Sequence, residues 1–302
     1  MILALLVTAL LVSLVVNFSY TMRLDVVQAG NLRDLIRVGY VARSGVELAK
    51  VVLQEDDATC DTLDEAWAHF SEHAGIIGEG DEGRFRGVIV DEASKLNINS
   101  LVNDQGEILP DRLEQLARLF DLLEFEREVL DSIVDWMDRD DDEEPAGAES
   151  AYYESLSPPY SAKNGPLSSL EELMLVKGMT GEMLFGKGDT KGLADYVTIY
   201  SDEGRVNLNT ASALVLQSLS GEIDESLAEA IISHREGEPF RLVDDITRVP
   251  GLSGTDIGAY VTTTSSYFSV RMTGEMRELR KEIYTVMRRT GNRVNPVVWR
   301  MD

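Results

Sequence analysis

Two hydrophobic patterns run into one another at the start of the chain. Residues 1–22 carry no charged side chain and are mostly apolar, which matches the roughly 20 residues with which a helix crosses a bilayer. From Leu24 to Leu53, apolar residues then recur at spacings of mostly three and four, the period of an amphipathic helix. We therefore predict one continuous helix from residue 2 to about 54, with residues 1–22 as a transmembrane anchor.

A cleaved signal peptide is the alternative interpretation of this apolar stretch. Such peptides begin with a basic segment and end at a cleavage site of small residues. The sequence shows neither feature, and the helical pattern continues beyond the apolar run instead of stopping there. An anchor that stays on the chain is the better prediction.

Further along the chain the hydrophobic period alternates between that of strands and that of helices. Residues 107–136 have a helical period, and the C-terminal segments alternate between apolar and polar positions. An α+β fold follows, in which the long N-terminal helix packs on a small antiparallel sheet that a large all-helical insertion, about residues 100–265, interrupts. The predicted strands of this sheet are 84–91, 267–272, 279–287 and 294–301.

A short motif occurs twice along the chain. Residues 95–101, which contain Asn97 and Asn99, are echoed by residues 205–211, which contain Asn207 and Asn209. Asparagine and the small hydroxyl residue that follows are common N-caps, so each copy can begin a helix. The segments after the second copy resemble a helix-hairpin-helix or SAM-like module.

Three further stretches are the most specific in the sequence: Asp135-Trp136-Met137-Asp138-Arg139-Asp140, Gly147-Ala148-Glu149 and Pro158-Pro159-Tyr160. With the long helix and the interrupted sheet, they make the chain resemble, along nearly its whole length, the minor pseudopilins of the K type of bacterial type II secretion systems. The resemblance implies a pilin-like part made of residues 23–99 and 266–302. It also implies an inserted helical domain of residues 100–265.

The family resemblance also implies a function, a location and partners. A K-type pseudopilin is a single-pass protein of the inner membrane with its bulk in the periplasm, and it is not an enzyme. It assembles with minor pseudopilins of the I and J types into a tip complex that initiates or caps the periplasmic pseudopilus. Pilins usually have a glutamate near the mature N-terminus, and K-type subunits lack it. Here the first glutamate is Glu47.

One departure from the family pattern concerns the start of the chain. The family's precursors have a short basic leader that prepilin peptidase removes. This sequence begins at Met1, already inside the apolar run. Either the leader is missing from this sequence or the start lies too late, and the cleavage site cannot be located.

Charge and cysteine content narrow the alternatives. A formal net charge of −25 disfavours nucleic acid as the main partner, because an acidic surface repels phosphate. A membrane-anchored DNA receptor built on residues 205–265 is the second hypothesis, yet acidic residues outnumber arginines there. The single cysteine, Cys60, excludes an intramolecular disulfide.

A metallopeptidase is the third hypothesis. His69-Phe70-Ser71-Glu72-His73 fits the H-x-x-E-H pattern of an inverted zinc-peptidase motif, and a helix would place both histidines on one face. The motif is short, and no third ligand can be singled out. A solvated linker is the preferred interpretation.

The acidic loop at residues 138–149 is the strongest candidate site. Clustered carboxylates on a flexible loop suit Ca²⁺, which takes six to eight oxygen ligands, whereas a solvated acidic loop is the alternative. The family resemblance favours Ca²⁺, because K-type pseudopilins bind it. We predict Asp138, Asp140, Asp142 and Glu149 as ligands, with carbonyls of residues 143–150 and the side chain of Asn164 completing the shell.

Overall fold

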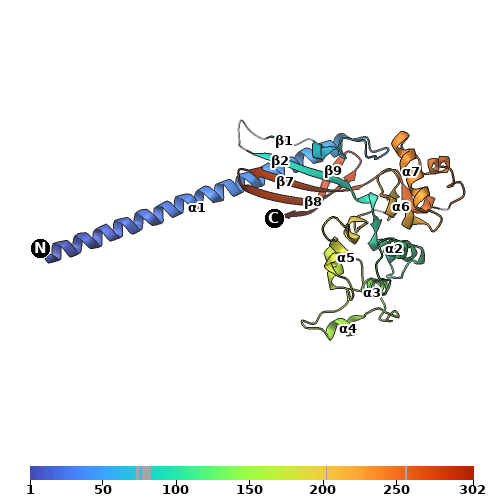
Figure 1. The fold of residues 1–302 in the computed structure, drawn as a ribbon, viewed down its shortest axis with the longest axis horizontal. Coiled ribbons are helices and arrows are strands. Elements are labelled where there is room, and N and C mark those ends of the chain that lie inside the picture. The colour runs from blue at the N-terminus through green and yellow to red at the C-terminus, as the bar shows by residue number, and fades with distance from the viewer. Residues whose placement is uncertain (73–74, 77–82, 202, 256) are drawn as a thin grey trace.

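A single helix dominates the N-terminal part of the computed structural model, which describes residues 1–72, 75–76, 83–201, 203–255 and 257–302. Helix α1 (Ile2–Glu55) is unbroken, as predicted, and its N-terminal half projects away from the rest of the molecule (Figure 1). Among the described residues it is the one helix long and apolar enough to cross a membrane. Its most apolar window has a mean hydropathy of 2.5, and none of that window is buried.

The sheet beside α1 has five antiparallel strands in the order β1-β2-β7-β8-β9. All four predicted strands are present, and the three C-terminal ones form a continuous meander. The alternation of burial along β2 matches a sheet with one face on the core. The strands are β1 (Gly75–Ile76), β2 (Arg84–Asp91), β7 (Tyr267–Met276), β8 (Leu279–Thr290) and β9 (Arg293–Met301).

Two glycines let α1 approach the sheet closely. A Cβ at Gly274 of β7 would lie 2.6 Å from both the Ala42 nitrogen and the Val38 oxygen of α1. A Cβ at Gly45 of α1 would lie 2.5 Å from the Met272 sulfur. A side chain at Gly274 would clash with the helix backbone, so α1 rests directly on β7 there, whereas at Gly45 the helix backbone rests on the side chains of Met272 and Phe85.

The apolar stripe of α1 explains why the C-terminal half of the helix packs on the sheet. Val46 is 1% exposed and shares a core with Phe85, Met272 and Ile283. The stripe therefore faces the chain's own sheet, as predicted for the long helix. Other apolar side chains of α1, Ile36 and Tyr40 among them, remain exposed on the opposite side.

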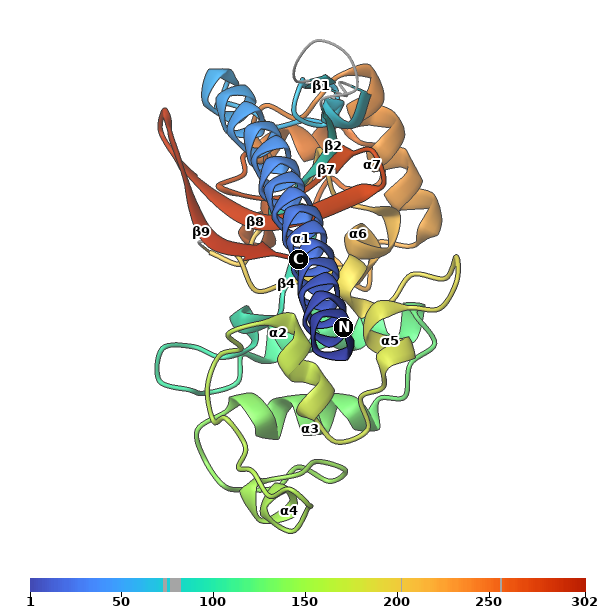
Figure 2. The same cartoon turned by 90° about the vertical axis from the view of Figure 1, so that its left-hand side faces the viewer.

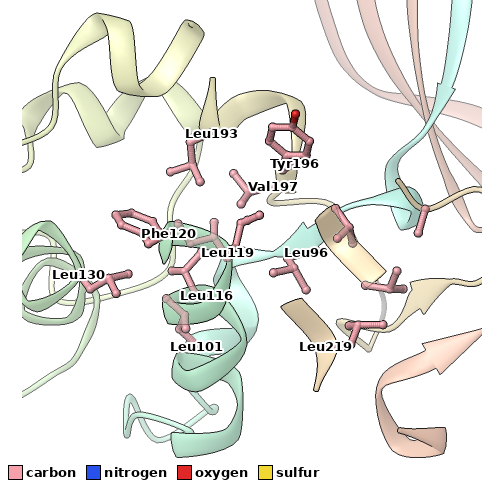
Figure 3. Packing of buried hydrophobic residues seen from close by; sticks show 14 of the residues in the cluster. Leu96, Leu101, Leu116, Leu119, Phe120, Leu130, Leu193, Tyr196, Val197 and Leu219 are labelled. Atoms are coloured by element: carbon pink, nitrogen blue, oxygen red, sulfur yellow. The ribbon is translucent and has the colours of Figure 1, made fainter. Parts of the chain in front are cut away.

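The insertion lies between β2 and β7 and has its own core. Figures 1 and 2 both place it beside the sheet, with α4 at its far end. Figure 3 shows Leu116, Phe120 and Leu130 packed near Leu96 and Val197 in this core. Its helices are α2 (Pro110–Leu122), α3 (Glu128–Met137), α4 (Ser150–Glu154), α5 (Gly181–Phe185), α6 (Ala213–Leu219) and α7 (Glu225–Gly237).

The insertion departs from the all-helical prediction in two respects. The helical pattern of 107–136 forms two helices, α2 and α3, because Glu124 between them has a positive φ of 58°. Two parallel ribbons are also present, which join β3 (Leu96–Asn97) to β4 (Val197–Thr198) and β5 (Val206–Asn207) to β6 (Val261–Thr262). Strands of two residues leave no alternation for a sequence pattern to reveal.

A buried polar cluster joins the insertion to the sheet. Asp91, at the end of β2, is 2% exposed. Its carboxylate accepts hydrogen bonds from Thr210 Oγ1 (2.5 Å), Ser265 Oγ (2.7 Å) and the Ala93 nitrogen (2.8 Å). Burial raises the pKa of Asp91 to about 6, although these hydrogen bonds oppose the rise. One carboxylate thus ties together the points where the chain enters and leaves the insertion.

Candidate metal centre

Three of the predicted ligands converge where α3 ends. Asp138 follows Met137, the last residue of α3, and the chain then continues through Asp140 to Glu149, which precedes α4. One carboxylate oxygen from each of Asp138, Asp140 and Glu149 lies within 4.8 Å of the others. Asp138 and Glu149 are each 6% exposed, so two of the three carboxylates are withdrawn from water.

Three buried oxygens of this cluster lack hydrogen-bond donors in the part of the chain that the structure describes. Oδ1 of Asp138 and both carboxylate oxygens of Glu149 are buried, and none has a hydrogen-bond partner among the described residues. Leaving a buried polar group unpaired costs about 1–3 kcal/mol, and more when it is charged. An oxygen-seeking cation between the carboxylates would remove this cost, and three such oxygens in one place fit Ca²⁺.

The electrostatics of the cluster also favour a bound cation. Burial is the main cause that raises the pKa of Asp138 to about 7, and the charges of Asp140 and Glu149 contribute to the same rise. Burial likewise raises the pKa of Glu149, with the charge of Asp135 as the next cause. A bound divalent cation reverses both effects, because it stabilises the ionised form.

The other predicted ligands lie apart from the three-carboxylate cluster or beside it. Asp142 is exposed, and its backbone nitrogen donates to Asp140 Oδ1 (3.0 Å). Asn164 lies beside the cluster, since its Nδ2 donates to the Asp140 carbonyl (3.4 Å). Its Oδ1 is buried without a hydrogen-bond partner in the described part of the chain, which makes it a fourth oxygen available to a cation.

The carbonyls of the loop are partly occupied. Lys177 Nζ donates to the carbonyls of Ala146 (3.3 Å) and Gly147 (2.7 Å), two of the oxygens predicted to complete the shell. The lysine thus pins the loop from the side, and a cation would compete with it for these two oxygens.

Two carboxylates that the sequence prediction missed shape the loop. Asp131 Oδ2 accepts from the Ala146 nitrogen (3.0 Å), and Asp135 Oδ1 accepts from the Glu144 nitrogen (3.1 Å). A Cβ at Gly147 would lie 1.9 Å from Asp135 Oδ2, so only glycine fits there. Asp131 and Asp135 are four residues apart on α3, a spacing that places them on one face. That spacing was the available signal.

A second group of acidic residues is paired with an arginine. Asp56, Asp61 and Glu65 have carboxylate oxygens within 4.8 Å of one another. Arg289 of β8 pairs with Asp56 (2.8 Å) and with Asp61, which also accepts from the Ser265 nitrogen (2.7 Å). The guanidinium thus pairs with two of the three carboxylates, and Glu65 accepts from the Thr62 nitrogen (3.0 Å) and Trp67 Nε1 (2.7 Å), so these acidic residues form a structural network.

The zinc-peptidase motif gains no support from the structure. His69 is exposed and precedes the short 3-10 helix Phe70–Glu72, whereas His73 lies outside the described residues. Cys60 is buried, and its thiol donates to the Phe240 carbonyl (3.2 Å).

Three of the four arginines of the helix-hairpin-helix segment are engaged with protein groups. Arg235 Nη1 donates to the carbonyls of Leu208 (2.7 Å) and Ala211 (2.8 Å). Arg248 pairs with Asp245 at 2.9 Å, and Arg205 pairs with Glu203 at 3.0 Å. Phosphate recognition needs basic side chains directed at the ligand, and these three are directed at their own chain.

Comparison with known proteins gives one consistent result. Two family profiles, both described as type II secretion system (T2SS) protein K, match residues 94–202 and 206–271. Type II secretion system protein K of Aeromonas hydrophila is 29% identical over 94% of this chain and 91% of its own length. The protein of the same name from Klebsiella pneumoniae is 26% identical over 77% of this chain and 73% of its own.

A solved structure has the same fold. In the crystal structure of the GspK-GspI-GspJ complex from the type 2 secretion system of enterotoxigenic Escherichia coli, one chain superposes with a TM-score of 0.76 at 18% identity. The match covers 91% of this chain and 99% of that one. The predicted fold class, a long helix on an antiparallel sheet with an inserted helical region, is confirmed.

Proposed function

This chain belongs to the protein K family of the type II secretion system, and from that premise we propose that it is the subunit at the tip of the pseudopilus. The family consists of structural pseudopilins and not of enzymes, as the sequence predicted. The observation that carries the proposal is the insertion between β2 and β7. A bulky domain beside the sheet obstructs a further subunit above this one, so the end of the filament is where it fits.

The anchor and location follow from the apolar start of α1. Its uncharged half, fully exposed in the isolated chain, suits the bacterial inner membrane, and the acidic remainder suits the periplasm. The absence of a buried carboxylate among residues 1–22 makes this segment easy to insert, since an aspartate at the bilayer centre costs about 2.5–3.5 kcal/mol.

Minor pseudopilins of the I and J types are the proposed partners. The solved complex that shares this fold is named for three such proteins, GspK, GspI and GspJ. On the present chain, Ile36 (53% exposed) and Tyr40 (65% exposed) of α1 offer an apolar face that the chain's own sheet leaves open. A helix from another pseudopilin would bury that face.

Co-purification tests the assembly. The full-length chain in detergent should retain the I-type and J-type proteins, whereas Ile36→Asp should release them while its melting temperature stays within about 2 °C of wild type. Val88→Asp is the matched control, because Val88 is 44% exposed on β2 and lies away from α1. Retention of both partners by Ile36→Asp would refute this docking face.

The loop after α3 is proposed to bind Ca²⁺ through Asp138, Asp140 and Glu149. The unpartnered buried oxygens of Asp138 and Glu149 support it, and Asn164 Oδ1 is the fourth proposed ligand. Asp142 stays a candidate that reaches the ion only if the loop tightens.

A further inference from the structure

The two copies of the asparagine motif make the same hydrogen bonds. In the first copy, Asn99 Nδ2 donates to the Leu167 carbonyl (2.9 Å) and Asn99 Oδ1 accepts from the Leu167 nitrogen (2.7 Å). In the second, Asn209 Nδ2 donates to the Phe240 carbonyl (2.9 Å) and Asn209 Oδ1 accepts from the Phe240 nitrogen (2.9 Å). Each asparagine thus holds a distant segment by the backbone N–H and C=O of one residue.

The correspondence extends to the segments held. Leu167 is followed by the 3-10 helix Leu170–Leu175 and then by Gly178, with a φ of +81°. Phe240 is followed by the 3-10 helix Val243–Arg248 and then by Gly251, with a φ of +99°. Each copy then closes its own parallel ribbon, β3–β4 or β5–β6. We name residues 95–200 the first unit and residues 205–264 the second unit.

The units differ at one connection. In the second unit only Glu238 and Pro239 separate the end of α7 from the clamped Phe240. In the first unit residues 138–166, the acidic excursion, separate the end of α3 from the clamped Leu167. The candidate metal centre therefore lies in a long excursion that takes the place of a two-residue turn.

The two ends of the excursion meet at the metal centre. The Asn164 nitrogen donates to the Trp136 carbonyl of α3 (3.0 Å), and Asn164 Nδ2 donates to the Asp140 carbonyl (3.4 Å). Asp138 and Asp140 lie on the outgoing limb of the excursion, Glu149 at its middle and Asn164 on its returning limb. Without a cation, the repelling carboxylates of the outgoing limb and the middle oppose this closure.

We propose that cation binding at this closure orders the first unit alone, while the second unit, with its short turn, holds the same structure without metal. The inference rests on the proposed Ca²⁺ site. A cation joins the limbs of the excursion and so places Leu167 within hydrogen-bond distance of Asn99. In the second unit the two-residue turn places Phe240 beside Asn209 without a cation.

Hydrogen exchange on the full-length chain in detergent, with Ca²⁺ or with chelator, tests the inference. Chelation should raise exchange of the amides of α3 and residues 138–176 at least about tenfold and leave α6 and α7 within about twofold. Equal loss of protection in both units, or none in α3 and 167–176 although calorimetry shows that Ca²⁺ binds, would overturn it. Calorimetry that shows no Ca²⁺ binding overturns the proposed site itself, so the two failures are distinct.

A matched pair of variants separates coupling from general stability. Asn99→Ala removes the two hydrogen bonds to Leu167 in the first unit. Asn209→Ala removes the equivalent two bonds to Phe240 in the second unit, together with a contact to Cys60 Sγ (3.4 Å). Asn99→Ala should raise the Kd for Ca²⁺ about tenfold, because the ion must then order a return limb that nothing holds. Asn209→Ala should leave the Kd within about twofold. Similar Kd values for the two variants would contradict the proposal.

Discussion

Replacing Glu149 by glutamine should have opposite effects on stability with and without calcium. Both carboxylate oxygens of Glu149 are buried without a hydrogen-bond partner among the described residues, so its charge opposes folding when no cation is bound. With chelator, Glu149→Gln should therefore be more stable than wild type by about 1–3 kcal/mol, because glutamine keeps the shape of the side chain and removes its buried, unpaired charge.

Calcium should reverse that order. A ligand that binds only the folded state at 100 times its Kd stabilises it by about 2.7 kcal/mol, which is a shift of roughly 5–10 °C in a chain of this size. Wild type should show this shift, and Glu149→Gln should lose most of it because one anionic ligand is gone. The two melting curves should therefore exchange places on addition of calcium.

Thermal melts of both proteins, with chelator and with excess calcium, provide the assay. Asp142→Asn is the informative companion, because Asp142 is exposed outside the three-carboxylate cluster. An undiminished calcium response in Asp142→Asn would remove that residue from the ligand set. A wild type that melts at the same temperature in both buffers refutes the reasoning, as does a Glu149→Gln variant that is destabilised in chelator.

Two further predictions concern the junctions of the fold. Gly274→Ala should destabilise the chain by about 1–3 kcal/mol in urea unfolding, because the added Cβ would lie 2.6 Å from the α1 backbone. Gly221→Ala is the control and should be nearly neutral, because no atom lies within 4 Å of the added Cβ. Equal effects of the two substitutions would contradict this prediction. Asp91 has a folded pKa of about 6, above the unfolded value of about 3.9, so its protonated form favours folding. The contribution of Asp91 to the free energy of unfolding should thus fall by up to about 3 kcal/mol as pH rises from 4 to 6. Urea unfolding of wild type and Asp91→Asn at several pH values should show this fall in the difference between the two proteins. A difference that does not change with pH would disprove the prediction.

Elements in which one hydrophobic pattern continues over many residues were predictable from the sequence. Helix α1 and strands β2, β7, β8 and β9 were found because many residues repeat one pattern. The ribbons β3–β4 and β5–β6 were not, because they pair Leu96 with Val197 and Val206 with Val261, and pairing over such separations is a tertiary property that two-residue strands do not record. The break between α2 and α3 depends on the left-handed conformation of Glu124, which its residue type does not announce.

The candidate metal centre was only partly predictable. Charge density and the family resemblance pointed to Asp138, Asp140 and Glu149, which the fold brings together. The role of Asp131 and Asp135 in holding the loop was missed, because acidic residues on a helix usually face solvent. Lys177 is distant in sequence, and only the fold shows that it pins the loop carbonyls.

The ion pair between Arg289 and the acidic residues after α1 has a mechanical consequence. Asp56 caps the C-terminal end of a helix about 80 Å long, and Arg289 joins it to the Ser265 carbonyl (2.8 Å), where the chain leaves the insertion. The side chain of Arg289 is 4% exposed, so water does not compete for these interactions. A force or torque applied to the membrane end of α1 is therefore transmitted to the insertion through Arg289.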